Sequence, residues 1–188
     1  MTLQEYIQSF IDPDYDSNNP LPFKVTSGFY KKGSTISKIN EVENYAYFIN
    51  NGIAEMSILF EEDEKIIDFY FKGDFFSSYE SLLKNTPSRV QLKALTDLSV
   101  EKVYKQDLML AYNTSLLANK IGRHATEKLY LKKFKRETDL LIRTAEQNYL
   151  ELLNRDNKII SSIPVYKIAR YLGIRPESLS RIRKKSIS

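Results

Sequence analysis

The last 25 residues of the chain, 164–188, gather side chains that can recognise a polyanion. They include seven Lys or Arg and a single acidic residue, a net charge of +6. Arginine can bind the O6 and N7 atoms of guanine, and glutamate can accept a hydrogen bond from the cytosine amino group. Lysine and serine can bind phosphates and fix the register. The candidate DNA-contacting residues are Arg175, Glu177, Ser178, Ser180, Arg181, Lys184, Lys185 and, slightly upstream, Lys167.

The spacing of apolar residues around Gly173 predicts the scaffold that presents these side chains. Gly173 stands where a helix can end in a left-handed turn, and Pro176 suits the first turn of the next helix. Leu179 and Ile182 would form the buried side of that second helix. The pattern predicts a helix-turn-helix whose second helix enters the major groove of DNA. The alternative is a basic helical hairpin with no role in DNA binding. The apolar side of the first helix consists of Val165, Ile168, Ala169 and Leu172.

Charge is distributed unevenly along the 188 residues. Residues 1–111 hold 11 Lys or Arg and 17 Asp or Glu, a net of −6, whereas residues 112–163 carry a net of +4. An acidic front and a basic end indicate that only the C-terminal part meets a polyanion, although many basic tails are merely solvated.

The sequence pattern of residues 29–103 predicts short strands. Runs of β-branched and aromatic residues alternate with turn signals, which is typical of an antiparallel sandwich or roll. Asn51-Gly52 predicts a hairpin, and the acidic run Glu61–Glu64 predicts a solvated hairpin tip. Residues 75–83 (FFSSYESLL) predict one or two helical turns. At the N-terminus, Thr2 and Glu5 have capping-box spacing, which predicts a short helix.

A long helix is predicted from Asn113 to about Leu153, with a second helix starting at the capping-box spacing of Thr144 and Gln147. About 25 helical residues span roughly 38 Å, more than a small roll can cover, so a twin helix in a homodimer is the expected partner. Packing of the helix on its own β-domain is the alternative. The expected division is 1–111, 112–143 and 144–188. The predicted dimer stripe is Leu117, Ile121, Ala125, Leu129 and Phe134.

The order of these elements resembles the Crp–Fnr family of regulators over roughly residues 25–185. The resemblance rests on three segments. They are ARYLGIRPESLSRIRK near the C-terminus, FKGDFF upstream of it, and the stretch from Gly33 to Gly52. The resemblance implies an α+β fold: a β-roll like a cyclic nucleotide-binding domain, a dimerisation helix and a helix-turn-helix. It also implies base contacts by Arg181 and Glu177. Pro176 stands where the catabolite activator has a base-contacting arginine, so a different target sequence is expected.

The resemblance also locates a ligand site, and here the chain departs from the family. Ser77-Ser78 replaces the family's Gly-Glu pair, and Ser88 falls on the position of its phosphate-binding arginine. A shift of one residue on a strand turns a side chain to the opposite face, so Arg89 would face solvent. Alternatively, a bulge could return Arg89 inward and Glu80 could replace the missing acid. The candidate pocket residues are Gly73, Phe76, Ser77, Ser78, Glu80, Ser88, Arg89 and Val90.

We therefore expect no usual binding of a cyclic nucleotide. Another small anionic ligand, or none, remains open. The chain has no Cys, which excludes an iron–sulfur sensor and a thiol switch and fits a reducing cytoplasm. No signal peptide or membrane span is visible, so a cytoplasmic location is expected. The expected partners are double-stranded DNA, a second copy of the chain and RNA polymerase, with no membrane.

An enzyme is not expected. His124 is the sole histidine, so neither a metal site nor a Ser-His-Asp arrangement can be assigned, and no Walker loop occurs. A metal-dependent jelly-roll enzyme would need His and Glu ligands on its strands, whereas His124 lies on the predicted long helix. A β-roll module whose basic tail docks a protein instead of DNA remains the alternative to a transcription regulator.

Overall fold

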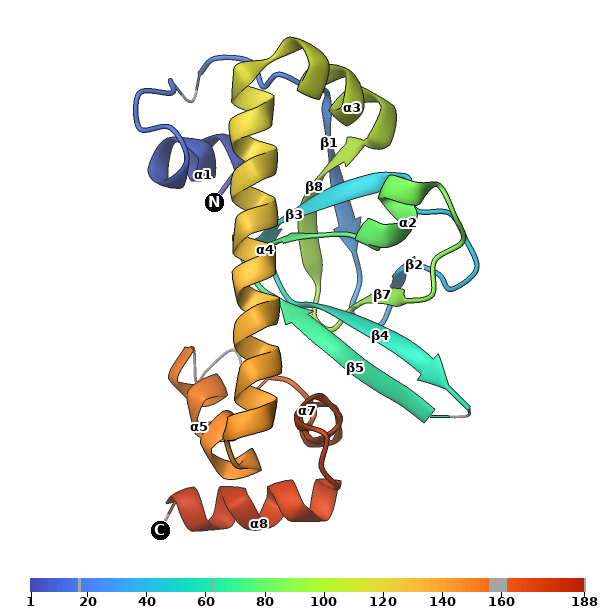
Figure 1. Cartoon of the computed structure of the whole chain (residues 1–188), viewed down its shortest axis with the longest axis vertical. Helices are drawn as coiled ribbons and strands as arrows, with labels where there is room; N and C mark the ends of the chain where they lie inside the picture. Colours follow the sequence, from blue (N-terminus) through green and yellow to red (C-terminus); the bar gives the residue numbers. More distant parts are fainter. Residues whose placement is uncertain (17, 62, 156–161, 188) are drawn as a thin grey trace.

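The strands between residues 25 and 104 form two antiparallel sheets that enclose a roll (Figure 1). The computed structural model describes residues 1–16, 18–61, 63–155 and 162–187. One sheet has the order β1-β8-β3-β6 and the other β2-β7-β4-β5. The strands of the first sheet are β1 (Val25–Tyr30), β8 (Leu98–Tyr104), β3 (Tyr45–Asn51) and β6 (Phe75–Phe76). Those of the second are β2 (Thr35–Ser37), β7 (Gln91–Ala94), β4 (Ala54–Phe60) and β5 (Asp63–Tyr70). The predicted fold class is confirmed.

The roll interior is filled by side chains from alternate positions of both sheets. Phe76 stacks between Tyr47 and Tyr70, with ring centroids 5.0 and 5.4 Å apart. All three rings are buried, together with Ile49, Met56, Leu92 and Val100. Aromatic packing therefore occupies the space between the sheets.

The turn at Asn51-Gly52 does not form the hairpin that its sequence predicts. β3 and β4 belong to different sheets and do not pair. Gly52 has φ +97°, and a Cβ there would overlap the backbone carbonyl of Asp97, so glycine is required. The local signal correctly places a turn, but the tertiary fold uses this turn to carry the chain from one sheet to the other.

Three helices lead to the long helix. α1 (Leu3–Phe10) has the predicted capping box of Thr2 and Glu5. α2 (Tyr79–Lys84) follows β6, and α3 (Lys105–Thr114) follows β8. Ser115 is extended and separates α3 from α4 (Leu116–Ile142). Its side chain caps α4 by accepting a hydrogen bond from the Ala118 amide. The long helix thus begins at Leu116 rather than Asn113, and the expected boundary after residue 111 falls inside α3.

α4 runs along the molecule, and its two halves are attached by different forces (Figure 1). Near its start, Ala118 and Ile121 are buried in an apolar cluster with Phe48 and Val103. Further along, Lys132 and Lys133 lie 3.1 and 2.8 Å from the two carboxylate oxygens of the buried Asp68. One turn before them Lys128 pairs with Asp74, and just beyond them Arg136 donates to the carbonyl of Tyr171. Apolar burial therefore predominates at the start of α4, where Lys120 also pairs with Asp12 at 2.8 Å, and charged contacts predominate from Lys128 onward.

Three helices at the C-terminal end pack against the roll through a shared apolar core. They are α5 (Ala145–Arg155), α7 (Val165–Leu172) and α8 (Pro176–Ile187). Thr144 and Gln147 form the predicted reciprocal cap of α5, so the second helix begins where the sequence predicts and runs to Arg155 rather than Leu153. Ile66 and Phe69 of the roll join Leu172 of α7 in this core. None of the helices in the described part of the chain is both long and apolar enough to cross a membrane.

Candidate functional site

α7, a tight turn and α8 form a helix-turn-helix at the far end of the molecule (Figure 1). Gly173 adopts the left-handed conformation, φ +69° and ψ +25°, and the Ile174 amide donates to the Ala169 carbonyl at 3.0 Å. Pro176 opens α8, where its missing N–H is tolerated. Leu179 is fully buried against α7 and the rest of the C-terminal core. Glycine, proline and leucine thus fix the angle between the two helices, as the sequence predicts.

The opposite side of α8 is exposed and basic. Arg175 and Arg181 form no ion pair with any residue of the described segments, whereas Lys185 lies 3.3 Å from Glu146 of α5. Their exposure leaves this side of α8 free to approach a groove. The exposed candidate contacts are Arg175, Glu177, Ser178, Ser180, Arg181, Lys184 and Lys185.

Lys167, also predicted to bind DNA, is instead buried between α7 and the β4–β5 hairpin. Its Nζ atom lies 2.6 Å from Glu55 Oε1 and 3.4 Å from Glu64 Oε2. Burial raises the pKa of Glu55, while Lys167 and Lys93 lower the pKa of Glu64 despite its partial burial. Glu64 is therefore not part of a solvated hairpin tip. Lys167 joins the helix-turn-helix to the roll and is not available to DNA in this arrangement.

The predicted anion pocket does not form a cationic cradle. Arg89 is 75% exposed, and its Nη2 lies 2.7 Å from the exposed Glu80 Oε2, so the inward-facing alternative is wrong. Ser88, on the family's arginine position, is buried and hydrogen-bonds Ser78 at 2.6 Å and the Val90 carbonyl at 2.7 Å. The two hydroxyl groups thus hydrogen-bond each other at a place where an anion site would need a positive charge. The remaining candidates Gly73, Phe76 and Ser77 are also buried.

Comparisons with known proteins fit this geometry. Residues 28–115 match the family model described as the cyclic nucleotide-binding domain. FixK2 from Bradyrhizobium japonicum has a TM-score of 0.74 at 22% identity, over 86% of this chain and 84% of FixK2. A protein assigned to the Crp/Fnr family from Eubacterium rectale has a TM-score of 0.69 at 15% identity, over 87% of this chain and 79% of its own.

A third similar structure is CLP from Xanthomonas campestris, described as a global regulator responsive to c-di-GMP. Its TM-score is 0.65 at 16% identity, with 86% of each chain covered. A search by sequence finds no similar protein among the curated ones. Over about 86% of its length, the chain therefore shares the fold of these three solved structures. Within residues 28–115, the buried Ser78–Ser88 pair and the exposed Arg89 distinguish the site from one built around an inward arginine.

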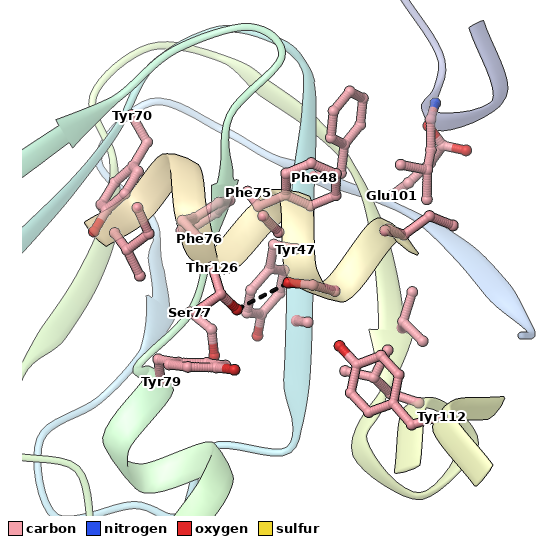
Figure 2. Close-up of a pocket in the computed structure, with 18 residues that line it drawn as sticks. Tyr47, Phe48, Tyr70, Phe75, Phe76, Ser77, Tyr79, Glu101, Tyr112 and Thr126 are labelled. Atoms are coloured by element: carbon pink, nitrogen blue, oxygen red, sulfur yellow. Dashed lines mark hydrogen bonds between the residues drawn. The ribbon is translucent and has the colours of Figure 1, made fainter. Parts of the chain in front are cut away.

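The domain does have a cavity, but it lies to the side of the predicted pocket. A space of about 90 Å³ separates β3, β6 and β8 from α3 and α4 (Figure 2). Of the predicted pocket residues, only Phe76 and Ser77 line it. Sequence reasoning missed this cavity because its walls come from distant segments. The signal that could have revealed it is the run of small residues Ala118, Gly122 and Ala125 on one face of α4.

The predicted dimer stripe on α4 divides between two environments. Ile121 is buried and Leu117 packs on the same apolar cluster, while Ala125 and Leu129 line the cavity, so these four face the chain's own β-domain. Phe134 alone is exposed, at 58%. The opposite side of the helix presents a second apolar set. Its exposed members include Leu116, Tyr130, Leu131, Leu141 and Ile142.

Proposed function

We propose that this chain is a DNA-binding transcription regulator that acts as a homodimer. The observation that carries the proposal is the exposed basic side of α8, presented by a helix-turn-helix at the free end of the molecule. A recognition helix in this position can enter the major groove without disturbing the roll. The shared fold supports the same function, because CLP is described as a global regulator and the Eubacterium rectale protein as a transcriptional regulator of the Crp/Fnr family. A contact with RNA polymerase remains a prediction of the family resemblance.

The proposed dimer uses the exposed side of α4. Leu116, Tyr130, Phe134 and Leu141 are separated by fourteen, four and seven residues, which places them on one side of a helix. Pairing this side with its copy removes it from water and brings two α8 helices onto one duplex. Their separation must then be close to ~34 Å, one turn of DNA. We retain 144–188 as the proposed DNA-binding unit and 1–111 as the sensor, with α4 between them.

Arg181→Ala should weaken binding to the preferred DNA site by about 1–3 kcal/mol and relax the base preference at one position. Arg181 is exposed in the middle of α8, where a guanidinium can bind guanine in a fork. Sites selected from random duplexes by the unaltered protein provide the substrate for a mobility or anisotropy titration. Equal losses on selected and random DNA would contradict base contact by Arg181.

The affinity for DNA should also fall steeply with salt. A protein that neutralises 6–10 phosphates loses roughly 10³–10⁵ in affinity between 50 and 200 mM salt. Each α8 helix offers fewer than six basic side chains, so the loss for each chain should be less than about 10³ over the same interval. Titrations at four salt concentrations give the slope, and Lys184→Ala should reduce that slope by about one, because one fewer phosphate is neutralised. A flat response would show that the basic side of α8 does not bind the duplex.

A further inference from the structure

Seven of the 18 described residues that line the cavity between the first sheet and α4 are aromatic (Figure 2). Tyr47 and Phe76 close it from the roll, Tyr112 from α3 and Leu129 from α4. Tyr79 lies on its edge with 37% of its surface exposed. Planar side chains on several sides favour a planar, apolar occupant.

The described residues that line the cavity include no Lys or Arg. Glu101 is the single acidic side chain among them, and its Oε2 atom already accepts from the Leu3 amide at 2.7 Å and from Asn50 Nδ2 at 2.6 Å. A charged ligand would therefore be desolvated without an opposite charge to compensate it. This excludes a phosphate group and favours a neutral molecule.

Two tyrosine hydroxyl groups on the cavity wall lack hydrogen-bond partners among the described residues, those of Tyr79 and Tyr112. By contrast, Ser77 donates to the Tyr45 carbonyl and Thr126 to the Gly122 carbonyl (Figure 2). Burial, with a further contribution from Tyr79, raises the pKa of Tyr112 to about 12, so its hydroxyl is neutral and able to donate. An occupant with one polar group would satisfy it.

Small residues on α4 keep the cavity open. Gly122 lies inside a 27-residue helix, where glycine costs about 1 kcal/mol relative to alanine. A Cβ at this position would lie 2.5 Å from the Tyr112 hydroxyl, so the glycine lets that hydroxyl approach the helix. Ala125, one turn further along, also lines the space. A larger residue at either position would close the cavity.

We propose that this cavity binds a small neutral aromatic molecule with one hydroxyl or carbonyl group, such as a phenol, between the first sheet and α4. An enclosed apolar cavity of about 150 Å³ holds benzene, so the present 90 Å³ must widen when a ring enters. Widening means that α4 moves away from the sheet. If the proposed function holds, the same movement changes the separation of the two α8 helices and makes DNA binding depend on the ligand.

The test is a calorimetric titration of the full chain with phenol, without DNA. We expect saturable binding with a Kd on the order of 1 mM or tighter, and at least tenfold weaker binding of benzoate, which has the same ring and a negative charge. Ala125→Leu should abolish phenol binding, whereas the same substitution at Ala145 on α5 should leave it unchanged. Absence of saturable phenol binding at concentrations well above 1 mM would overturn the proposal.

A second variant keeps the test informative if Ala125→Leu does not fold. Tyr112→Phe removes one hydroxyl and retains the ring, so phenol binding should weaken about fivefold, the value of one neutral hydrogen bond. Toluene, which lacks a hydroxyl, should bind equally well before and after this change. An identical response of phenol and toluene would contradict the role of Tyr112. Because these measurements omit DNA, their failure is distinct from a failure of ligand-free protein to bind duplex.

Discussion

Lys167→Met should lower the free energy of unfolding by about 3–5 kcal/mol, the cost of leaving a buried charge without its partner. The Glu55 carboxylate is 1% exposed, and Lys167 is its direct ion-pair partner at 2.6 Å. Methionine retains most of the apolar stem of lysine, so the loss reports the charge rather than the packing. Urea unfolding followed by circular dichroism measures it. The double variant Glu55→Met with Lys167→Met should recover most of the loss, because a well-packed apolar pair can replace a buried ion pair.

The same substitution at an exposed pair is the control. Lys84 lies 2.9 Å from Glu80 with 65% of its side chain exposed, and Lys84→Met should change stability by less than about 1 kcal/mol. In Lys167→Met, the folded state should favour protonated Glu55, whose pKa is already raised by burial from 4.5. Folding then takes up a proton, so the loss should be smaller near pH 4.5 than at pH 7. A loss at Lys167 no larger than that at Lys84 would contradict a buried, structural pair.

Phe134→Asp should convert the dimer to a monomer and reduce affinity for a two-half-site duplex by roughly 10²–10⁴-fold. Phe134 is 58% exposed on the apolar side of α4 that we propose to pair with its copy. A buried aspartate on each helix would place two like charges in the interface. Sedimentation equilibrium gives the oligomeric state, and titrations with whole and half sites give the affinities. Binding to a half site should be unchanged, because α8 is untouched.

Phe60→Asp is the matched control. Phe60 is 62% exposed, but it ends β4 in the hairpin with β5, away from the exposed side of α4. The same substitution at Phe60 should leave both the dimeric mass in solution and the affinity for DNA unaltered. A monomeric unaltered protein, or a dimer that survives Phe134→Asp, would show that this side of α4 is not the interface.

The parts of the structure that sequence predicts well are those decided over a few residues. The caps at Thr2 and Thr144, the left-handed turn at Gly173 and the start of α8 at Pro176 all follow from local backbone chemistry. The exposed side of α8 follows from helical periodicity around the buried Leu179. Aligning the chain with the family's pattern is also enough to show that Ser88 stands where an anion site would have an arginine.

The rest depends on contacts between distant segments. An exposed-looking lysine on α7 becomes buried only because Glu55 and Glu64 reach it from the hairpin. The apolar stripe that contains Ile121 could pack against the chain's own sheet or against a second helix, and the helical pattern does not distinguish the two. Asn51-Gly52 fixes a turn without fixing which strands pair. The cavity is lined by residues from β3, β6, β8, α3 and α4, so no one of these segments predicts it alone.

The different attachment of the two halves of α4 has a consequence for temperature. Apolar contacts such as that of Ile121 with Phe48 weaken on cooling, because the hydration of apolar surface becomes less unfavourable. The contacts of Lys132 and Lys133 with Asp68 behave oppositely, since the cost of desolvating charges falls on warming. Cold therefore loosens the end of α4 nearest α3, and warmth relatively strengthens the end nearest the helix-turn-helix. A single helix thus responds to heat in opposite senses at its two ends.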